Sequence, residues 1–343
     1  MYPTSPAAVP LPLRHKRLGL VIHSYWQRWH GQRATALRPR FESELAVLRH
    51  ACGLGAGSFQ ITVRGWSADF ADQMRAEAEA AAVKLEASLD LPRDAADVAR
   101  FEAEVRTARR AGMSILRTWI GGRRYEDFST RGEFDAFKAR AQLGLELAEP
   151  VVRRHGSWLA AENHKDFEAP ELVAMLSCLG SDRIGVCLDF GNNLALLEDP
   201  VATVETLAPL AITTHIKDLA LQESAGGFRM AEVPLGEGAL DLPRLLAIIE
   251  RANPRVEHHL EMITRDPLEI GCRSEGYWAT FPEKPRSELE RALALVRATQ
   301  SDTLPSMDGK TDDDILALEE ENNRRCFAAA AAKLGFASSP DRR

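Results

Sequence analysis

Short apolar runs alternate with longer helical patterns along most of the chain. The first run, LGLVIH at 18–23, is short and aliphatic and ends in a polar residue, which is typical of a buried strand. Helical spacing of Phe41, Leu45 and Leu48 follows, and glycines then end that helix. The predicted strands are 18–23, 59–63, 83–89, 113–120, 157–163, 184–190, 211–218 and 256–262. The helices predicted after the later strands are 68–82, 94–111, 134–155, 170–179, 201–207, 242–252 and 287–299.

Eight strand–helix units between residues 17 and 300 predict a parallel sheet covered by helices. An open doubly wound sheet is the competing arrangement. It usually carries a GxGxxG motif that opens a helix after the first strand, and this motif is absent from the sequence. We therefore predict the α/β class, with a single (β/α)8 TIM barrel over residues 17–300.

The segments outside the barrel are short. Residues 1–16 are predicted to form an N-terminal arm, and residues 301–343 a linker and a C-terminal helix. Thr311 is a good N-cap for a helix over 311–335, with Asp314 at the capping-box position. This helix packs either on the outside of its own barrel or against a neighbouring subunit, so a homo-oligomer formed through it is an open alternative.

Composition is that of an ordinary globular protein, with 45% hydrophobic and 27% charged residues. The 43 Lys+Arg against 50 Asp+Glu give a net charge of −7, which argues against nucleic acid and an anionic membrane surface as partners. The five cysteines form no CxxC pair, and no apolar run is long enough for a membrane span or a signal peptide. These features predict a reducing, cytoplasmic location.

Polar residues end four consecutive strands: Glu162, Asp189, His215 and Glu261. The first two gaps, of 27 and 26 residues, each match one strand–helix unit. Because the carboxyl ends of barrel strands meet at one rim, these four side chains are expected to converge. Three carboxylates and an imidazole would repel one another without a cation. They suit one divalent metal ion, Mn²⁺, Mg²⁺, Co²⁺ or Zn²⁺, with coordination positions left open for substrate oxygens.

The phrases ENHKDF, LDFGN, THIKD, PLGEG and LEM carry a resemblance to a known family. These phrases occur in the family's order, and over about residues 17–300 the chain resembles the xylose isomerase-like TIM barrels. This family includes sugar-phosphate isomerases/epimerases and ketose 3-epimerases. The resemblance implies that Glu162, Asp189, His215 and Glu261 bind the metal, with Mn²⁺ as the first choice. It also implies that Glu162 and Glu261 are the catalytic acid/base pair of an isomerase or epimerase. Such an enzyme converts a small carbohydrate, a sugar or keto-sugar derivative, through a metal-stabilised enediolate.

Two alternatives stay open beside this function. The stretch VETLAP…THIKD…PLGEG, followed by EMITRDPL, looks more like members that act as lyases. Those members decarboxylate 3-oxo sugar acids, dehydrate, or eliminate from 3-keto-glycosides with the same metal site. A non-catalytic sugar-binding barrel is the other alternative. The related DNA endonucleases are disfavoured, because the extra histidine ligands are absent and Asn192 stands where a histidine follows the strand-six aspartate.

Substrate contacts are predicted at six positions, each with a structural alternative such as an ion pair or core packing. The residues are His23, Arg117, His164, Asn192, Lys217 and Arg229. Strand alternation places Lys217 on the same side as His215, and Arg229 matches a loop arginine that contacts substrate in some epimerases.

Four neighbouring features are assigned other roles. Lys165 is a weak Schiff-base candidate, because a loop lysine beside a metal has no apolar pocket to lower its pKa. Asp218 is a local cap or a partner of the metal ligands. Residues 219–240 are expected to be a loop, and residues 265–278 a lid or an interface loop.

Overall fold

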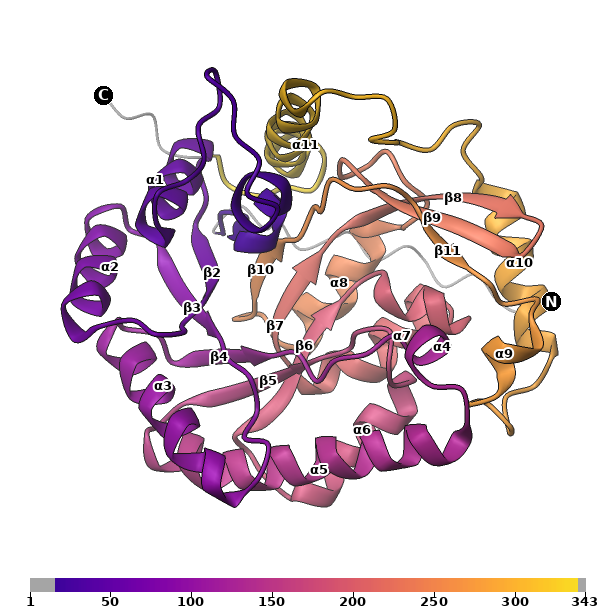
Figure 1. Cartoon of the computed structure of the whole chain (residues 1–343), viewed down its shortest axis with the longest axis horizontal. Helices are drawn as coiled ribbons and strands as arrows, with labels where there is room; N and C mark the ends of the chain where they lie inside the picture. Colours follow the sequence, from indigo (N-terminus) through magenta and orange to yellow (C-terminus); the bar gives the residue numbers. More distant parts are fainter. Residues whose placement is uncertain (1–15, 339–343) are drawn as a thin grey trace.

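The computed structural model describes residues 16–338, and the predicted N-terminal arm at 1–16 lies outside this range except for Lys16. Eight parallel strands form a closed barrel in the order β1-β10-β7-β6-β5-β4-β3-β2 (Figure 1). Their bounds are β1 Gly19–Val21, β2 Ser58–Thr62, β3 Lys84–Ser88, β4 Ile115–Thr118, β5 Trp158–Glu162, β6 Ile184–Asp189, β7 Ala211–Ile216 and β10 Glu257–Leu260. Strand β1 pairs with both β2 and β10, which closes the barrel. The predicted TIM barrel and its eight strands are therefore confirmed.

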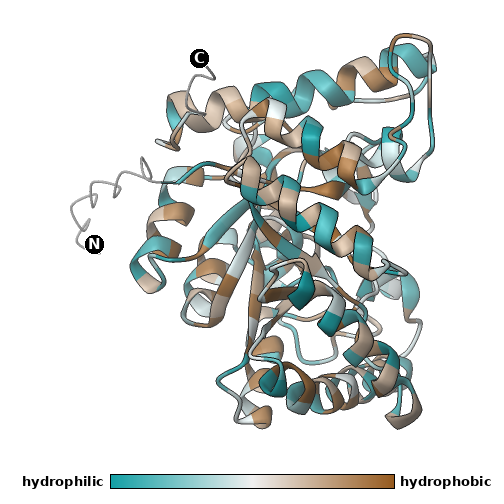
Figure 2. Ribbon diagram, turned by 90° about the vertical axis from the view of Figure 1, so that its left-hand side faces the viewer, coloured by the Kyte–Doolittle hydropathy of each residue, from teal (hydrophilic) through white to brown (hydrophobic). Residues whose placement is uncertain are grey.

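Helices surround the barrel in the order that the apolar spacing predicts. They are α1 Glu44–Leu54, α2 Ala68–Ala80, α3 Val98–Arg110, α5 Arg131–Arg154, α6 Ala169–Leu179, α7 Pro200–Leu207, α8 Leu242–Ala252 and α10 Ser287–Thr299. Two shorter helices, α4 Arg124–Asp127 and α9 Glu275–Trp278, lie in loops. Helix α1 begins at Glu44 because the Ser43 side chain accepts a hydrogen bond from Ala46 N. Hydrophobic and hydrophilic positions alternate along these helices (Figure 2), and one continuous core joins them to the strands.

Most of residues 219–233 form strands rather than the expected loop. Strands β8 Asp218–Ser224 and β9 Gly227–Val233 form a hairpin, and β11 Leu268–Ile270 pairs with β9 in an antiparallel three-stranded sheet. Only Lys217 separates β7 from β8, so no turn residues mark the start of a second strand in the sequence. The segment 265–278 supplies β11 and α9, and its apolar residues join a second core with α10. The expectation of a loop was therefore wrong for most of 219–233, while residues 234–240 lie outside the strands.

The C-terminal helix α11, Asp312–Lys333, packs on its own barrel beside the segment that follows β1 (Figure 1). Thr311 and Asp314 form the predicted capping box. The helix contacts the two short helical segments after β1, Ile22–Tyr25 and Trp26–His30. Within residues 16–338, no helix has the length and apolarity that crossing a bilayer would require.

Candidate metal centre

Glu162, Asp189, His215 and Glu261 converge at the carboxyl ends of the barrel strands. One candidate ligand atom from each residue lies within 4.8 Å of the others, and all four side chains are buried. Glu162 and Asp189 end β5 and β6, and Asp189 pairs in register with His215 of β7. Glu261 directly follows β10. Parallel strands that end at one rim therefore bring together residues 99 positions apart in the sequence.

Hydrogen bonds orient the His215 ring toward the other three residues. Gln60 of β2 donates from Nε2 to the Glu86 carboxylate (3.2 Å), so its Oε1 is the atom that accepts from His215 Nε2 (2.8 Å). Nδ1 then faces Glu162 Oε1 at 3.4 Å and Glu261 Oε1 at 3.6 Å, and it has no hydrogen-bond partner within the described chain. Burial opposes a charge on the ring, but Glu261 and Glu162 raise the pKa of His215 well above its usual value, so a metal at this position would replace the Nδ1 proton. A ring fixed through one nitrogen, with the other facing carboxylates, is the arrangement that metal-binding histidines usually have.

Asp189 presents one oxygen to the cluster. Its Oδ1 accepts from the backbone N of Gly191 and of Asn192, both at 2.9 Å. Its buried Oδ2 makes no hydrogen bond within residues 16–338 and forms an ion pair with Lys217 Nζ, 2.8 Å away. Carboxylate oxygens that converge with an imidazole nitrogen are a donor set for a divalent cation, so the residues present fit the predicted metal.

Charged neighbours keep both glutamates ionised. Burial opposes the charge on Glu162, but Arg117 and His215 hold the pKa of its carboxyl well below the usual range. Burial likewise opposes the charge on Glu261, where Lys217 and His215 hold the pKa well below its usual range. Both residues are therefore available as anionic ligands at neutral pH.

A cavity of about 580 Å³ opens onto this cluster. It is lined by Glu162 and Glu261 and by five of the six residues predicted to contact substrate, namely His23, Arg117, His164, Asn192 and Lys217. Arg229 is not among the lining residues. It lies on β9 with an exposed side chain that donates to Gln222 Oε1, because residues 219–240 form a hairpin instead of a loop over the site.

The cavity residues differ in how firmly they are held. Arg117 donates to Glu162 and to Ser88 Oγ (3.0 Å), so it is an ion-pair partner of a candidate ligand. Lys217 Nζ lies 2.6 Å from Glu261 Oε2. His23 Nδ1 lies 3.5 Å from Glu261 Oε1 and is partly exposed to the cavity.

Asn192 and His164 complete this wall. Asn192 donates to Glu162 Oε1 (3.3 Å) and accepts from Lys165 Nζ (2.5 Å). Burial lowers the pKa of His164 to about 3, so the ring is neutral, with Nδ1 3.1 Å from the carbonyl oxygen of Gly122.

Two residues that orient the ligands were not predicted. Gln60 orients His215, and Asn163 accepts from Asp189 N (2.7 Å) and donates to Asp189 O (2.9 Å). Lys165 and Arg265 line the cavity, at positions that the sequence placed beside the site, in the phrase after Glu162 and in the expected lid. A polar residue inside the apolar run FQITV was the one available indication for Gln60. Asn163 and Lys165 lie in the ENHKDF phrase that identified Glu162.

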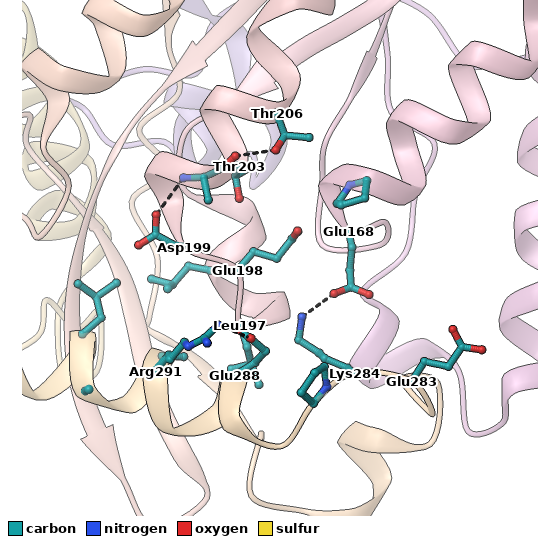
Figure 3. Close-up of a pocket in the computed structure, with 17 residues that line it drawn as sticks. Glu168, Leu197, Glu198, Asp199, Thr203, Thr206, Glu283, Lys284, Glu288 and Arg291 are labelled. Atoms are coloured by element: carbon teal, nitrogen blue, oxygen red, sulfur yellow. Dashed lines mark hydrogen bonds and ion pairs between the residues drawn. The ribbon is translucent and has the colours of Figure 1, made fainter. Parts of the chain in front are cut away.

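A larger cavity, of about 790 Å³, lies apart from the metal ligands (Figure 3). Residues of α6, α7 and α10 line it, and Lys284 pairs there with Glu168. Five of its lining side chains are acidic: Glu168, Glu198, Asp199, Glu283 and Glu288. None of the four clustered residues reaches it, so it is separate from the candidate metal centre.

Comparison with known proteins gives consistent results. A curated relative, 3-oxo-isoapionate decarboxylase from Pectobacterium atrosepticum, is 28% identical over 272 residues, covering 76% of this chain and 91% of the relative. The structure of D-psicose 3-epimerase in the presence of D-fructose aligns with 93% of this chain and 99% of that one, with a TM-score of 0.61 and 15% identity. A xylose isomerase-like TIM barrel protein from Mycobacterium smegmatis in complex with magnesium aligns with 84% and 99%, with a TM-score of 0.52 and 14% identity. At such identities the two structural matches support the fold alone.

The family model for the xylose isomerase-like TIM barrel matches residues 48–299. This range runs from α1 to the end of α10 and contains all four clustered residues. The chain therefore belongs to the xylose isomerase-like TIM barrel family.

Proposed function

We propose that this protein is a divalent-metal-dependent lyase that decarboxylates a 3-oxo sugar acid. The observation that carries the proposal is the charge of the cavity beside the metal centre. Five basic side chains line it, namely Arg117, Arg123, Lys165, Lys217 and Arg265, against four carboxylates, Glu126, Asp127, Glu162 and Glu261. A divalent cation bound by the two glutamates would leave the balance of charge positive. A neutral sugar needs no such surroundings, whereas a carboxylate is attracted by them. The curated relative that is a 3-oxo-isoapionate decarboxylase supports the same substrate class.

Glu162, Asp189, His215 and Glu261 would hold the metal. When bound, a divalent cation supplies Lewis-acid polarisation of the 3-oxo group and stabilises negative charge on its oxygen. The chain itself orients the ligands, through Gln60 on His215 and Arg117 on Glu162. The identity of the metal stays a prediction, with Mn²⁺ as first choice.

An isomerase or epimerase is the second candidate. Glu162 and Glu261 approach His215 Nδ1 from β5 and from the end of β10, an arrangement suited to an acid/base pair on two faces of a substrate. Each glutamate, however, is ion-paired, with Arg117 or with Lys217. These pairs lower the pKa of both carboxyls and weaken them as bases. We therefore rank an isomerase or epimerase, which needs proton removal by a glutamate, below the decarboxylase.

Incubation of the Mn²⁺-loaded protein with 3-oxo-isoapionate in deuterated water tests the proposal. We expect CO₂ release that is lost with EDTA and in Glu162→Gln, and unchanged in Glu205→Gln, an exposed position on α7. Deuterium incorporation without CO₂ would assign the isomerase or epimerase. If this and related keto-sugars give neither CO₂ release nor deuterium incorporation, the result favours the non-catalytic sugar-binding barrel.

A further inference from the structure

Lys165 is a buried lysine without a carboxylate partner. Its side chain lines the cavity, and the residue is only 3% exposed. Its Nζ donates to Asn192 Oδ1 (2.5 Å), and no carboxylate of the described chain lies within ion-pairing distance. Lys217, on the same wall, lies 2.6 Å from Glu261 and 2.8 Å from Asp189. Because buried lysines are nearly always paired, the isolation of Lys165 needs an explanation.

Backbone contacts hold this lysine inward. Lys165 forms a β-bridge with Arg123, and its carbonyl accepts from Arg124 N (2.8 Å), so the loop after β5 is fixed against the loop after β4. The sequence interpretation, that no apolar pocket could lower its pKa, was wrong because this loop folds into the protein. Burial lowers the pKa of Lys165 to about 7. The like charges of Lys217 and Arg265 act in the same direction, and Asp189 and Glu232 oppose them.

The position of Lys165 connects it to the metal centre through one side chain. The Asn192 amide accepts from Lys165 Nζ on one side and donates to Glu162 Oε1 (3.3 Å) on the other. Lys165 and Glu162 therefore line the same cavity with a single amide between them. A substrate that reaches Glu162 comes within reach of the lysine.

We propose that Lys165 is the catalytic acid that protonates the carbon from which CO₂ leaves. The inference rests on the proposed decarboxylation. Cleavage of the bond between C2 and the carboxyl carbon releases CO₂ and leaves the electron pair in an enediolate. The Lys165 ammonium then gives a proton to C2, forming a C–H bond, and the resulting amine takes a proton from water. One proton is consumed for each CO₂ released, and the product carries CH₂OH in place of the carboxylate-bearing carbon.

Three other polar groups of the cavity are poorer donors. Opposing its burial, Asp189 and Glu261 hold the pKa of Lys217 well above its usual value, so that proton is not given up. Arg117 stays charged, and its Nη2 proton is committed to Glu162. His164 is neutral and its Nδ1 is engaged by a backbone carbonyl. Lys165 alone among these four groups both carries a proton and releases it near neutral pH.

The stereochemistry of protonation tests the role of Lys165. The Mn²⁺-loaded enzyme is incubated with 3-oxo-isoapionate in deuterated water, and the new CHD centre is analysed by NMR. We expect wild type and Lys310→Met, an exposed lysine, to place deuterium on one face. Lys165→Met is expected to lower kcat by about 10²–10⁴-fold and to place deuterium on both faces, because solvent then protonates the released enediol. A Lys165→Met product labelled on one face, with kcat within twofold of wild type, would overturn the proposal.

A second measurement keeps the test independent of how that variant folds. Competitive acetylation of the wild-type holoenzyme across pH, read by mass spectrometry, reports the titration of each lysine. We expect Lys165 to react with a midpoint near 7 and Lys310 with one near that of an ordinary lysine, about 10.4. A Lys165 midpoint near 10 together with CO₂ release overturns the role of the lysine alone. Absence of CO₂ release from wild type overturns the decarboxylation, and the proton-donor role falls with it.

Discussion

The His215–Gln60 hydrogen bond decides which imidazole nitrogen faces the cluster. Gln60 is itself fixed by Glu86, whose other hydrogen bond comes from Thr213 Oγ1 (2.8 Å). Burial raises the pKa of Glu86 to about 7, with the two hydrogen bonds acting against the increase. A buried polar network between β2, β3 and β7 therefore fixes the orientation of one histidine ring.

Removing this support is expected to weaken metal binding. In Gln60→Leu the ring loses its acceptor, and we expect the affinity for Mn²⁺ to fall by about 10–100-fold. Isothermal titration calorimetry measures the change. Gln73→Leu, on the exposed face of α2, is the matched control and is expected to bind like wild type. An affinity in Gln60→Leu within twofold of wild type would mean that His215 is not a ligand through Nδ1.

The four candidate ligands could be predicted because each follows from one strand and its end. The role of Gln60 and the lowered pKa of Lys165 could not be, since both depend on other parts of the chain. Gln60 contacts a residue 155 positions away, and the pKa of Lys165 follows from how deeply its loop is buried. The prediction that Arg229 contacts substrate assumed that it lies in a loop over the site. Arg229 instead lies on strand β9, and its side chain is exposed.

Among the elements, α11 supports one wall of the cavity. Glu319 accepts from the backbone N of Gln27 (2.6 Å) and of Arg28 (3.1 Å), and Asn323 donates to Ser24 O (2.8 Å). The segment that they hold carries His23, which lines the cavity. The capping box and apolar positions predicted the helix, but its docking uses polar side chains whose partners lie near the other end of the chain.

The docking of α11 is expected to weaken as pH rises. Burial raises the pKa of Glu319 from 4.5 to about 7, so the folded state binds its proton more tightly than the unfolded state does. The resulting stabilisation is fully present below pH 4.5 and is lost as pH rises to about 7, a change of about 3 kcal/mol. Urea unfolding of wild type and Glu319→Gln at pH 5 and pH 8 measures it. The variant, neutral at both values, is expected to lose less stability over this interval, and equal losses would contradict the role of Glu319.

The eight strand–helix units were predictable because hydrophobic spacing repeats through the barrel. The three-stranded sheet was not, since β8 follows β7 after one residue and β11 is only three residues long. A strand of that length has too few positions for an alternating pattern to stand out. It is defined by pairing with β9, in a register of Leu268 with Met230 and Ile270 with Phe228.

At the scale of the whole molecule, the metal centre brings together strands that lie far apart in the sequence. Its four residues lie between positions 162 and 261 and end neighbouring strands on one side of the barrel. Three of them are carboxylates and form part of the excess negative charge that gives the chain its net charge of −7. Lys217 and Arg117 offset part of this charge, and a divalent cation would offset more, so metal binding and folding are expected to be coupled.

Metal binding is therefore expected to raise the stability of the entire barrel. At a free Mn²⁺ concentration 100 times the dissociation constant, one site that exists only in the folded state adds about 2.7 kcal/mol to the free energy of unfolding. Differential scanning calorimetry should show Tm higher by a few degrees with Mn²⁺ and restored to the starting value by EDTA. Asp189→Asn, which weakens the cluster, is expected to abolish the increase, while Asp313→Asn, exposed on α11, keeps it. Because ligand-induced stabilisation follows site occupancy, an equal increase in Asp189→Asn and wild type would place the bound metal elsewhere on the protein.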